Sequence, residues 1–401
     1  MTPFENFILE HEKDDCSRLL LCREKWPDID MDLAVSTIES RRRLRNKLPE
    51  WYAHSALVYP SRLCSEQCSS GETAAYKAEA AGTRIFQGRP FKAADLTGGL
   101  GADAWAFSRV SGNPVLYNEM NTALARAAGY NFSELGTDAI IRNMEIRPGN
   151  VRDILGDFQP DLIFMDPARR SADGRKVFLL EECSPDVTAL QDELFACCRH
   201  IMLKLSPMAD LSMLRSRLSH IREIHVVATG GECREVLVWQ DRDFDGDGIL
   251  VCCESGNTAE FPFDSESGAR GMFCKGPEDI CGWLFEPGKS LTKAGLFKSI
   301  SLRFDLPAAS PNSHLYISLE PLPEEVRRMG KVFEILSTLP LNGRNIKNLK
   351  KEYPRAEVSA RGIPMSSDEL RKRLGVDPSA EFHIFGLRAG NSNLLVVCRT
   401  C

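Results

Sequence analysis

Between residues 91 and 240, short apolar runs that end in turn residues alternate with segments of helix-like spacing. Such an alternation predicts a parallel β-sheet whose strands are joined by crossover helices. The last two expected strands are separated only by TGGEC, which is too short for a helix, so they should pair antiparallel. The expected strands are 91–96, 114–118, 143–147, 161–165, 200–205, 221–228 and 234–239.

The pattern changes on both sides of this region, which divides the chain into four expected domains. Residues 1–75 carry helix-like apolar spacing and should form an N-terminal helical region, followed by a core over 76–240. Residues 241–322 combine turns with short β runs, which is typical of a small α+β unit. After the linker-like PLPEE, residues 328–401 form a last module with strand-like ends. A chain of 401 residues is long enough to bury several cores.

Charge, cysteine spacing and hydropathy exclude several classes of protein. A net charge of −6 argues against a wholly basic nucleic-acid coat, although it leaves room for a local basic face. The 14 cysteines are too sparse for a disulfide scaffold and fit no zinc ribbon, so we expect reduced thiols in a cytoplasmic protein without a metal site. The start, MTPFENFILEHEKDD, lacks the features of a signal peptide, and no long uncharged apolar run predicts a membrane span.

The segment FKAADLTGGLGADAWAF (91–107) predicts a ligand-binding turn between the first strand and its helix. Asp95 ends the strand, and Gly98, Gly99 and Gly101 allow a tight turn whose backbone can touch a ligand. The helix N-terminus adds free N–H groups and partial positive charge. Glu119, 24 positions beyond Asp95, ends the second strand, where a carboxylate can bind both hydroxyls of an adenosine ribose.

Two nucleotide-like cofactors fit this turn, and a packing turn without any ligand is a third interpretation. Gly99-x-Gly101-x-x-Ala104 satisfies the dinucleotide fingerprint, so NAD is a competitor. Asp95 favours S-adenosylmethionine (SAM) instead, because its carboxylate can receive the ammonium of the methionine part and would repel a pyrophosphate.

Asn150 and Val151 follow the third expected strand, in IRPGNVRDIL. At that place their side chains can hydrogen-bond the amino group of an adenine and cover its ring. A plain polar turn is the alternative interpretation of this segment.

The fourth expected strand ends in MDPARRS, on the carboxyl edge of the sheet where ligands of open α/β folds bind. Asp166 can accept an N–H from an acceptor amine, and Pro167 fixes φ and leaves a carbonyl free for a second one. Arg169 and Arg170 can clamp the phosphates that flank a base. The alternative is a strand-terminating turn in which the aspartate pairs with one of the arginines.

Taken together, DLTGGLGADAWAF, YNEM, GNV and MDPARR resemble the motifs of class I SAM-dependent methyltransferases. With its C-terminal module, the chain resembles the bacterial group of these enzymes that carries a THUMP-like domain. The resemblance covers most of the chain and implies an α/β fold. This fold would be a Rossmann-like, seven-stranded core with N-terminal helices and small C-terminal α+β domains. Residues 241–322 would then be ferredoxin-like and residues 328–401 THUMP-like.

From the motifs and the resemblance together we predict the site residues. The expected catalytic residues are Asp166, Pro167 and Arg169. Thr73, in CSSGETAAYKAEA, lies in a segment similar to one that closes over the cofactor in related RNA enzymes. The expected cofactor contacts are Asp95, Thr97, Gly98, Gly99, Gly101, Asp103, Glu119, Met120, Asn150 and Val151.

The acceptor motif departs from the family pattern. Base-amino methyltransferases carry Asp/Asn-Pro-Pro followed by an aromatic residue that stacks on the flipped base, whereas this chain has Ala168 and Arg169. An Asp-Pro-Pro-Arg motif occurs in enzymes that methylate C5 of uridine, and these need a cysteine nucleophile. Cys183, in LEECSPD, is the nearest candidate in sequence, and a buried structural thiol is the alternative.

Residues 341–375 hold nine Lys or Arg against four Asp or Glu, a net charge of +5 in a chain whose total is −6. A concentrated basic surface of this kind predicts a nucleic-acid contact, and a solvated helix face is the alternative. THUMP domains belong to RNA-modifying enzymes, so the resemblance implies structured RNA, either tRNA or rRNA, recognised by shape and phosphate contacts. The predicted RNA-binding residues are Arg170, Arg344, Lys347, Lys350, Lys351 and Arg355.

The function predicted from the sequence is a cytoplasmic SAM-dependent methyltransferase that acts on a base in tRNA or rRNA, with the THUMP-like domain helping to bind RNA. One alternative keeps the enzyme but gives it a protein or a small molecule as substrate. Another is a non-catalytic protein that binds SAM and RNA. We expect neither a membrane nor a metal among its partners.

Overall fold

The computed structural model describes residues 1–168 and 180–401, so the predicted site residues Arg169 and Arg170 lie outside the described part of the chain. The chain divides into two compact units. Unit 1 comprises Met1–Arg222 with Val236–Gly246, and unit 2 comprises Glu223–Glu235 with Asp247–Cys401. Among the described residues, no helix combines the length and apolar character that crossing a membrane requires.

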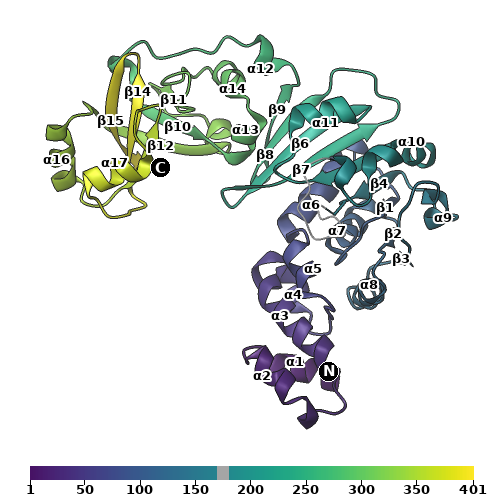
Figure 1. Cartoon of the computed structure of the whole chain (residues 1–401). Coiled ribbons are helices and arrows are strands. Elements are labelled where there is room, and N and C mark those ends of the chain that lie inside the picture. The colour runs from purple at the N-terminus through teal and green to yellow at the C-terminus, as the bar shows by residue number, and fades with distance from the viewer. Residues whose placement is uncertain (169–179) are drawn as a thin grey trace. The chain divides into compact units, whose positions relative to one another are not determined.

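Unit 1 begins with short helices that form a column leading to the sheet (Figure 1). Polar side chains start them: Asp30 caps α3 by accepting from the Leu33 N–H, and Ser70 caps α6 by accepting from the Thr73 N–H. The basic end of α3 is partly internal, because Arg41 is buried and donates to two backbone carbonyls. The helical segments are α1(Pro3–Glu10), α2(Cys16–Leu21), η1(Arg23–Lys25), α3(Met31–Lys47), α4(Pro49–Ala53), α5(Arg62–Gln67), α6(Gly71–Ala80) and the π-helical η2(Ala81–Ile85).

Parallel strands in the order β3-β2-β1-β4-β5 form the centre of unit 1, and β7 lies antiparallel beside β5. Because the strands are parallel, their carboxyl ends meet at one edge, and β1 lies between β2 and β4 at the switch point of the sheet. The strands are β1(Ala93–Asp95), β2(Val115–Asn118), β3(Ala139–Arg142), β4(Leu162–Met165), β5(His200–Leu205) and β7(Glu232–Asp241). The helices between them are α7(Ala102–Ser111), α8(Thr122–Glu134), α9(Val151–Leu155), η3(Leu180–Glu182), α10(Val187–Cys197) and α11(Leu211–Arg217).

The third strand lies four residues earlier than predicted. We expected it at 143–147, whereas β3 ends at Arg142. The reason is local hydrogen bonding: the Asn143 amide donates to two backbone carbonyls of the loop after β2, and the Met144 N–H donates to the side chain of Asn118. The segment after Arg142 therefore folds over the end of β2 and leaves the ladder.

Unit 2 contains most of β6, which pairs parallel with β8, and β8 pairs antiparallel with β9. Its second sheet has the order β11-β10-β12-β15-β14-β13, so the strands before and after residue 325 belong to one sheet. The strands are β6(Ile221–Thr229), β8(Ile249–Glu254), β9(Asn257–Pro262), β10(Trp283–Pro287), β11(Tyr316–Ser318), β12(Gly330–Pro340), β13(Glu357–Arg361), β14(Phe382–Ala389) and β15(Ser392–Thr400). The helices are α12(Ser265–Gly268), η4(Pro277–Asp279), α13(Lys289–Ala294), α14(Phe297–Arg303), α15(Glu324–Arg327), α16(Gly343–Glu352) and α17(Ser367–Leu374).

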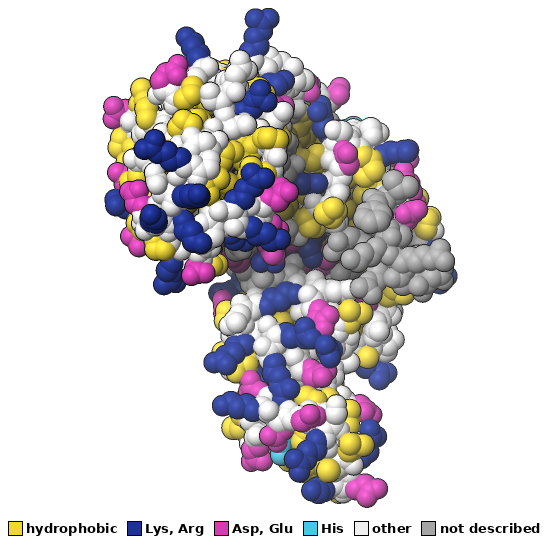
Figure 2. Space-filling model, turned by 60° about the vertical axis from the view of Figure 1, so that its left-hand side comes forward, with side chains coloured by type: hydrophobic (Ala, Val, Ile, Leu, Met, Phe, Trp, Pro, Cys, Tyr) yellow, Lys and Arg dark blue, Asp and Glu magenta, His cyan; other side chains and the backbone are white. Residues whose placement is uncertain are grey.

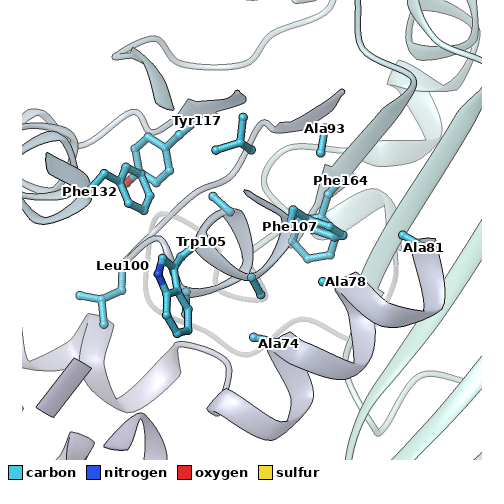
Figure 3. Packing of buried hydrophobic residues seen from close by; sticks show 14 of the residues in the cluster. Ala74, Ala78, Ala81, Ala93, Leu100, Trp105, Phe107, Tyr117, Phe132 and Phe164 are labelled. Atoms are coloured by element: carbon cyan, nitrogen blue, oxygen red, sulfur yellow. The ribbon is translucent and has the colours of Figure 1, made fainter. Parts of the chain in front are cut away.

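Charged side chains of both signs are interspersed over the face of the molecule shown in Figure 2, and apolar side chains lie scattered between them. The core of unit 1 is built around the contact between α6 and α7 (Figure 3). Ala74, Ala78 and Ala81 share one face of the helix at helical spacing, and their small side chains let α6 approach the Trp105 and Phe107 side of α7. This packing holds α7, and with it the loop after β1, in place.

Candidate active site

The loop after β1 is shaped by two close contacts that only glycine permits. The ring of Tyr117 lies against Gly98, where a Cβ would come within 2.0 Å of it, and the ring of Phe132 lies 2.7 Å from a Cβ built on Gly101. Gly98 also donates its N–H to the backbone oxygen of Asn118 at 2.8 Å. The loop is thereby fastened to the end of the neighbouring strand.

Gly99, at the tip of this loop, faces open space. Its φ is +52°, and nothing lies within 4 Å of the position that a Cβ would take. The Gly99 N–H donates to Glu119 Oε2 at 2.9 Å, and Glu119 Oε1 accepts from the Asn121 N–H at 2.8 Å. The half-buried carboxylate is therefore fixed beside an open stretch of backbone, and its remaining lone pairs can accept from the two hydroxyls of a ribose.

Asn118, which we did not predict as a site residue, joins the loops after the first three strands. Its buried amide donates to the backbone oxygens of Leu96 and Met144, both at 3.0 Å, and accepts from the Met144 N–H at 3.1 Å. A signal was available in the sequence, because an amide that ends a buried strand must satisfy its donors and acceptor locally.

Asn150 and Val151, the residues expected to contact the adenine, form hydrogen bonds to other residues of the protein. The Asn150 side chain accepts from the Arg147 N–H at 2.9 Å and donates to the Glu145 carbonyl at 2.8 Å. Val151 is buried, and its N–H donates to Glu193 of α10 at 2.7 Å. Their side chains thus shape the turn before α9.

At the end of β4, Asp166 contacts two neighbouring strand ends. Its N–H donates to Thr97 Oγ1 at 2.5 Å, and its Oδ2 accepts from Lys204 Nζ on β5, also at 2.5 Å. Lys204, only 13% exposed, is a site residue that our sequence reasoning missed. Pro167 follows as a buried corner. Asp166 therefore joins the loop after β1 to the ends of β4 and β5.

The predicted nucleophile candidate, Cys183, lies in the segment that runs beside this corner. Ala168 and Ser184 form an antiparallel bridge, with both N–H···O distances at or below 3.0 Å. Cys183 precedes the bridging serine and is half-buried.

Two buried charged residues, Asp103 and Lys77, form an ion pair next to the glycine loop. Asp103, at the start of α7, lies 3.1 Å from the fully buried Lys77 and accepts from the Ser69 hydroxyl at 2.7 Å. Burial alone would raise the pKa of Asp103, but the charges of Lys77 and Lys204 outweigh it and lower that pKa. Asp103 thus has partners within the protein at the start of α7.

Asp95 has the opposite electrostatic balance. It is 1% exposed, and burial together with the negative charge of Asp103 holds its pKa well above the usual aspartate range. Its side chain accepts a hydrogen bond from the Thr97 N–H at 3.1 Å. A cation placed here would favour the ionised carboxylate, which suits the ammonium of SAM and disfavours a pyrophosphate. Met120, at 62% exposure, offers an apolar surface beside Glu119.

The predicted RNA-binding residues of the C-terminal module lie on or next to α16 in unit 2. All five are exposed, and within the described residues none of them forms an ion pair. They are Arg344, Lys347, Lys350, Lys351 and Arg355. Over residues 1–168 and 180–401, no group of three or more His, Cys, Asp or Glu side chains is arranged to hold a metal ion.

Comparison with known proteins identifies the family. A sequence model described as "THUMP domain-like" matches residues 330–400, and one described as a "ferredoxin-like domain" matches residues 283–324. The crystal structure of a candidate methyltransferase from Porphyromonas gingivalis W83 is 31% identical to the chain, with a TM-score of 0.85 and coverage of 99% of this chain and 97% of that one. The chain belongs to this methyltransferase family. It is also similar to a protein named "uncharacterized S-adenosylmethionine-dependent methyltransferase" in two strains of Mycobacterium tuberculosis, with 26% identity over 91% of this chain and 96% of the relative.

These likenesses confirm that this methyltransferase is SAM-dependent, has the predicted Rossmann-like core with N-terminal helices, and carries a THUMP-like domain at its C-terminus. The geometry agrees with SAM as cofactor, because an open glycine tip, the fixed carboxylate of Glu119 and the buried carboxylate of Asp95 lie on adjacent strand ends.

Proposed function

We propose that this methyltransferase methylates a base in structured RNA, either tRNA or rRNA, and that its THUMP-like domain helps to bind that RNA. The observation that carries the proposal is the basic surface of the THUMP-like domain, which we define as Arg344, Lys347, Lys350, Lys351, Arg355, Lys372 and Arg373. All seven are exposed, and none is in an ion pair within the described residues. Exposed cations without local partners are suited to the phosphates of a nucleic acid.

The two helices bring these cations together. A Cβ at Gly375, where α17 ends, would lie 2.7 Å from Lys350 Nζ, so the Lys350 side chain of α16 reaches across to the end of α17. Lys372 and Arg373 lie in the last turn of α17. The Lys350 side chain of α16 therefore reaches the same end of α17 that carries Lys372 and Arg373.

In unit 1 we propose that the loops after β1, β2 and β3 hold the cofactor and that the end of β4 faces the acceptor. When bound, SAM supplies a methyl group activated by its sulfonium. The proposed cofactor-binding residues are Asp95, Thr97, Gly98, Gly99, Gly101, Asp103, Glu119, Met120, Asn150 and Val151.

Asp166 is proposed to accept an N–H of the acceptor and so direct the nitrogen lone pair. Lys204 and Thr97 hold Asp166 in place by hydrogen bonds to its carboxylate and its backbone N–H, respectively. Ala168 offers no ring for stacking, but Met208, 71% exposed after β5, provides a polarisable apolar surface that could cover a base. Arg169 remains a proposed catalytic residue and Arg170 a proposed contact of RNA phosphates, and both lie outside the described residues.

We further propose that the protein is cytoplasmic. Among the described residues, no disulfide joins any of the 14 cysteines, which agrees with a reducing compartment.

Binding of total tRNA to the full chain at increasing salt tests the proposed partner. We expect affinity to fall steeply with salt, and Lys350→Glu/Lys351→Glu to weaken binding and reduce the slope of log K against log salt by about 2. The matched control is Arg327→Glu/Arg328→Glu, an exposed basic pair of the same unit in which Arg327 ends α15 and Arg328 follows it. Equal binding by the α16 variant and the wild type would refute the RNA-binding role of this surface.

A further inference from the structure

Unit 2 contains a second concave site, formed where the segments matched by the ferredoxin-like and THUMP-like models meet. This pocket has a volume of about 380 Å³, within the range of small-ligand sites. Ser310 and Asn312 come from the ferredoxin-like segment, and Gly362 and Arg388 from the THUMP-like segment. Phe273 completes the lining from a segment outside both family models.

The lining contains one aromatic residue, one cation and two polar side chains, together with two glycines and the apolar residues Cys274, Ala309 and Pro311. Phe273 is 44% exposed, which is unusual for a ring of this size and leaves it available for contact. Arg388 is exposed, and its Nε donates to the Gly390 carbonyl at 3.2 Å, so one end of the guanidinium is anchored while its other N–H groups stay available. Among the residues that the structure describes, no acidic side chain lines the pocket.

The polar side chains of the lining can hydrogen-bond to the edge of a flat ligand. The Ser310 hydroxyl forms no hydrogen bond within the described residues, although its backbone is fixed by Ser313. The Asn312 side chain is exposed at the rim. Gly362, at φ +71°, leaves the space between Ser310 and Arg388 open. A Cβ at this position would lie 3.5 Å from Ser310 Oγ and 3.8 Å from Arg388 Cβ. A side chain at this position would fill space between the cation and the hydroxyl.

We propose that this pocket binds one unpaired nucleotide of the RNA substrate, with its base against Phe273, its edge toward Ser310 and Asn312, and its phosphate on Arg388. The proposal rests on the proposed RNA substrate and deepens it. An aromatic face with a neighbouring cation is how proteins bind unstacked nucleotides of single-stranded RNA, whereas duplex RNA buries its bases and cannot enter a pocket. The enzyme therefore requires a single-stranded element in its RNA as well as phosphates for α16.

The test compares binding of a short single-stranded RNA of mixed sequence with binding of the same sequence as a duplex, using the full chain. Phe273→Ala is expected to weaken binding of the single strand roughly 5- to 100-fold, the loss of one stacked base, and to leave duplex binding unchanged. Phe273→Trp should retain single-strand binding, and Arg388→Ala should weaken it and reduce its salt dependence. A 2-aminopurine in the single strand should be quenched by the wild type and not by Phe273→Ala.

Matched controls are Leu319→Ala, an apolar residue of unit 2 that is 72% exposed, and Arg327→Ala, a surface cation on α15. Single-strand binding by Phe273→Ala equal to that of the wild type, or an equal loss for the duplex, would overturn the proposal. If Lys350→Glu/Lys351→Glu weakens RNA binding while Phe273→Ala does not, only the pocket assignment fails. If the wild type binds neither RNA, the proposed substrate and the pocket assignment fail together.

Discussion

The Glu119 carboxylate links the two loops of the proposed cofactor site, accepting from the Gly99 N–H at 2.9 Å and from the Asn121 N–H at 2.8 Å. Glu119→Ala removes this link together with the acceptors for the ribose hydroxyls. We expect the Kd for SAM to rise roughly 10- to 100-fold by calorimetry, because hydrogen bonds to a charged acceptor contribute about 1.5–3 kcal/mol each. The matched control is Glu134→Ala, an exposed glutamate at the end of α8. SAM binding by Glu119→Ala as tight as by the wild type would contradict the assignment.

SAM binding should depend on pH through Asp95. Burial and Asp103 raise the pKa of Asp95, so this carboxyl is partly neutral at pH values where an ordinary aspartate is ionised. A neutral carboxyl does not attract the ammonium of SAM. Affinity should therefore fall as the pH drops through the raised pKa, and binding should release a proton. Calorimetry at about pH 5 to 7 in buffers of different ionisation enthalpy measures both effects. An equal pH dependence in Asp95→Asn would show that another group is responsible.

Gly98 and Tyr117 are in such close contact that a methyl group cannot be added between them. The Cβ of Gly98→Ala would lie 2.0 Å from the tyrosine ring, so the ring or the loop must move. We expect a loss of about 1–3 kcal/mol in the free energy of unfolding, measured in denaturant. Gly129→Ala on α8, where a Cβ makes an ordinary 3.5 Å contact with Ile141, should leave stability unchanged or raise it. Equal stability of both variants would mean that the loop accommodates the side chain freely.

The THUMP-like domain should lose stability at mildly acidic pH through His383. Burial lowers the pKa of His383 to about 4, and its Nε2 lies 2.9 Å from Ser359 Oγ while its ring stacks on Phe385. The unfolded chain binds the proton at about pH 6.5 and the folded chain does not. Stability is therefore complete above about pH 6.5 and falls by up to about 3 kcal/mol as the pH drops to about 4.

His383→Gln, which cannot gain a charge and can still hydrogen-bond Ser359, should flatten this dependence in thermal melts between those pH values. His54→Gln, a change at an exposed histidine in unit 1, serves as the control. If His383→Gln melts with the same pH profile as the wild type, the buried imidazole is not the responsible group.

The positions of three proposed site residues could be predicted from the sequence because each of them ends a strand or directly follows one. Asp95, Glu119 and Asp166 follow apolar runs, and parallel pairing brings the ends of their strands to one edge of the sheet. Lys204 could not be found in this way, because it lies inside the run HIMLKL and meets Asp166 only through the pairing of β4 with β5. Its partner is 38 residues away in sequence.

Errors in local detail came from side chains that compete with the backbone. Asn143 and Asn118 bind main-chain groups of neighbouring loops, and this ends β3 at Arg142, whereas apolar periodicity alone favoured a later strand. Asn150 stays a proposed contact of the adenine, and its amide also closes the turn in front of α9. Such hydrogen bonds depend on three-dimensional proximity and leave no periodic pattern in the sequence.

Transfer of labelled methyl groups from SAM to RNA tests most directly whether this enzyme modifies RNA. The substrate should be total RNA from cells that lack the gene, because their sites are unmodified. We predict label in a single nucleoside of tRNA or rRNA with the wild type. With Asp166→Ala we predict a rate lower by roughly 100-fold or more and unchanged SAM affinity, since this carboxylate acts on the acceptor. Label that appears only in protein, or an Asp166→Ala enzyme as fast as the wild type, would contradict the proposed function.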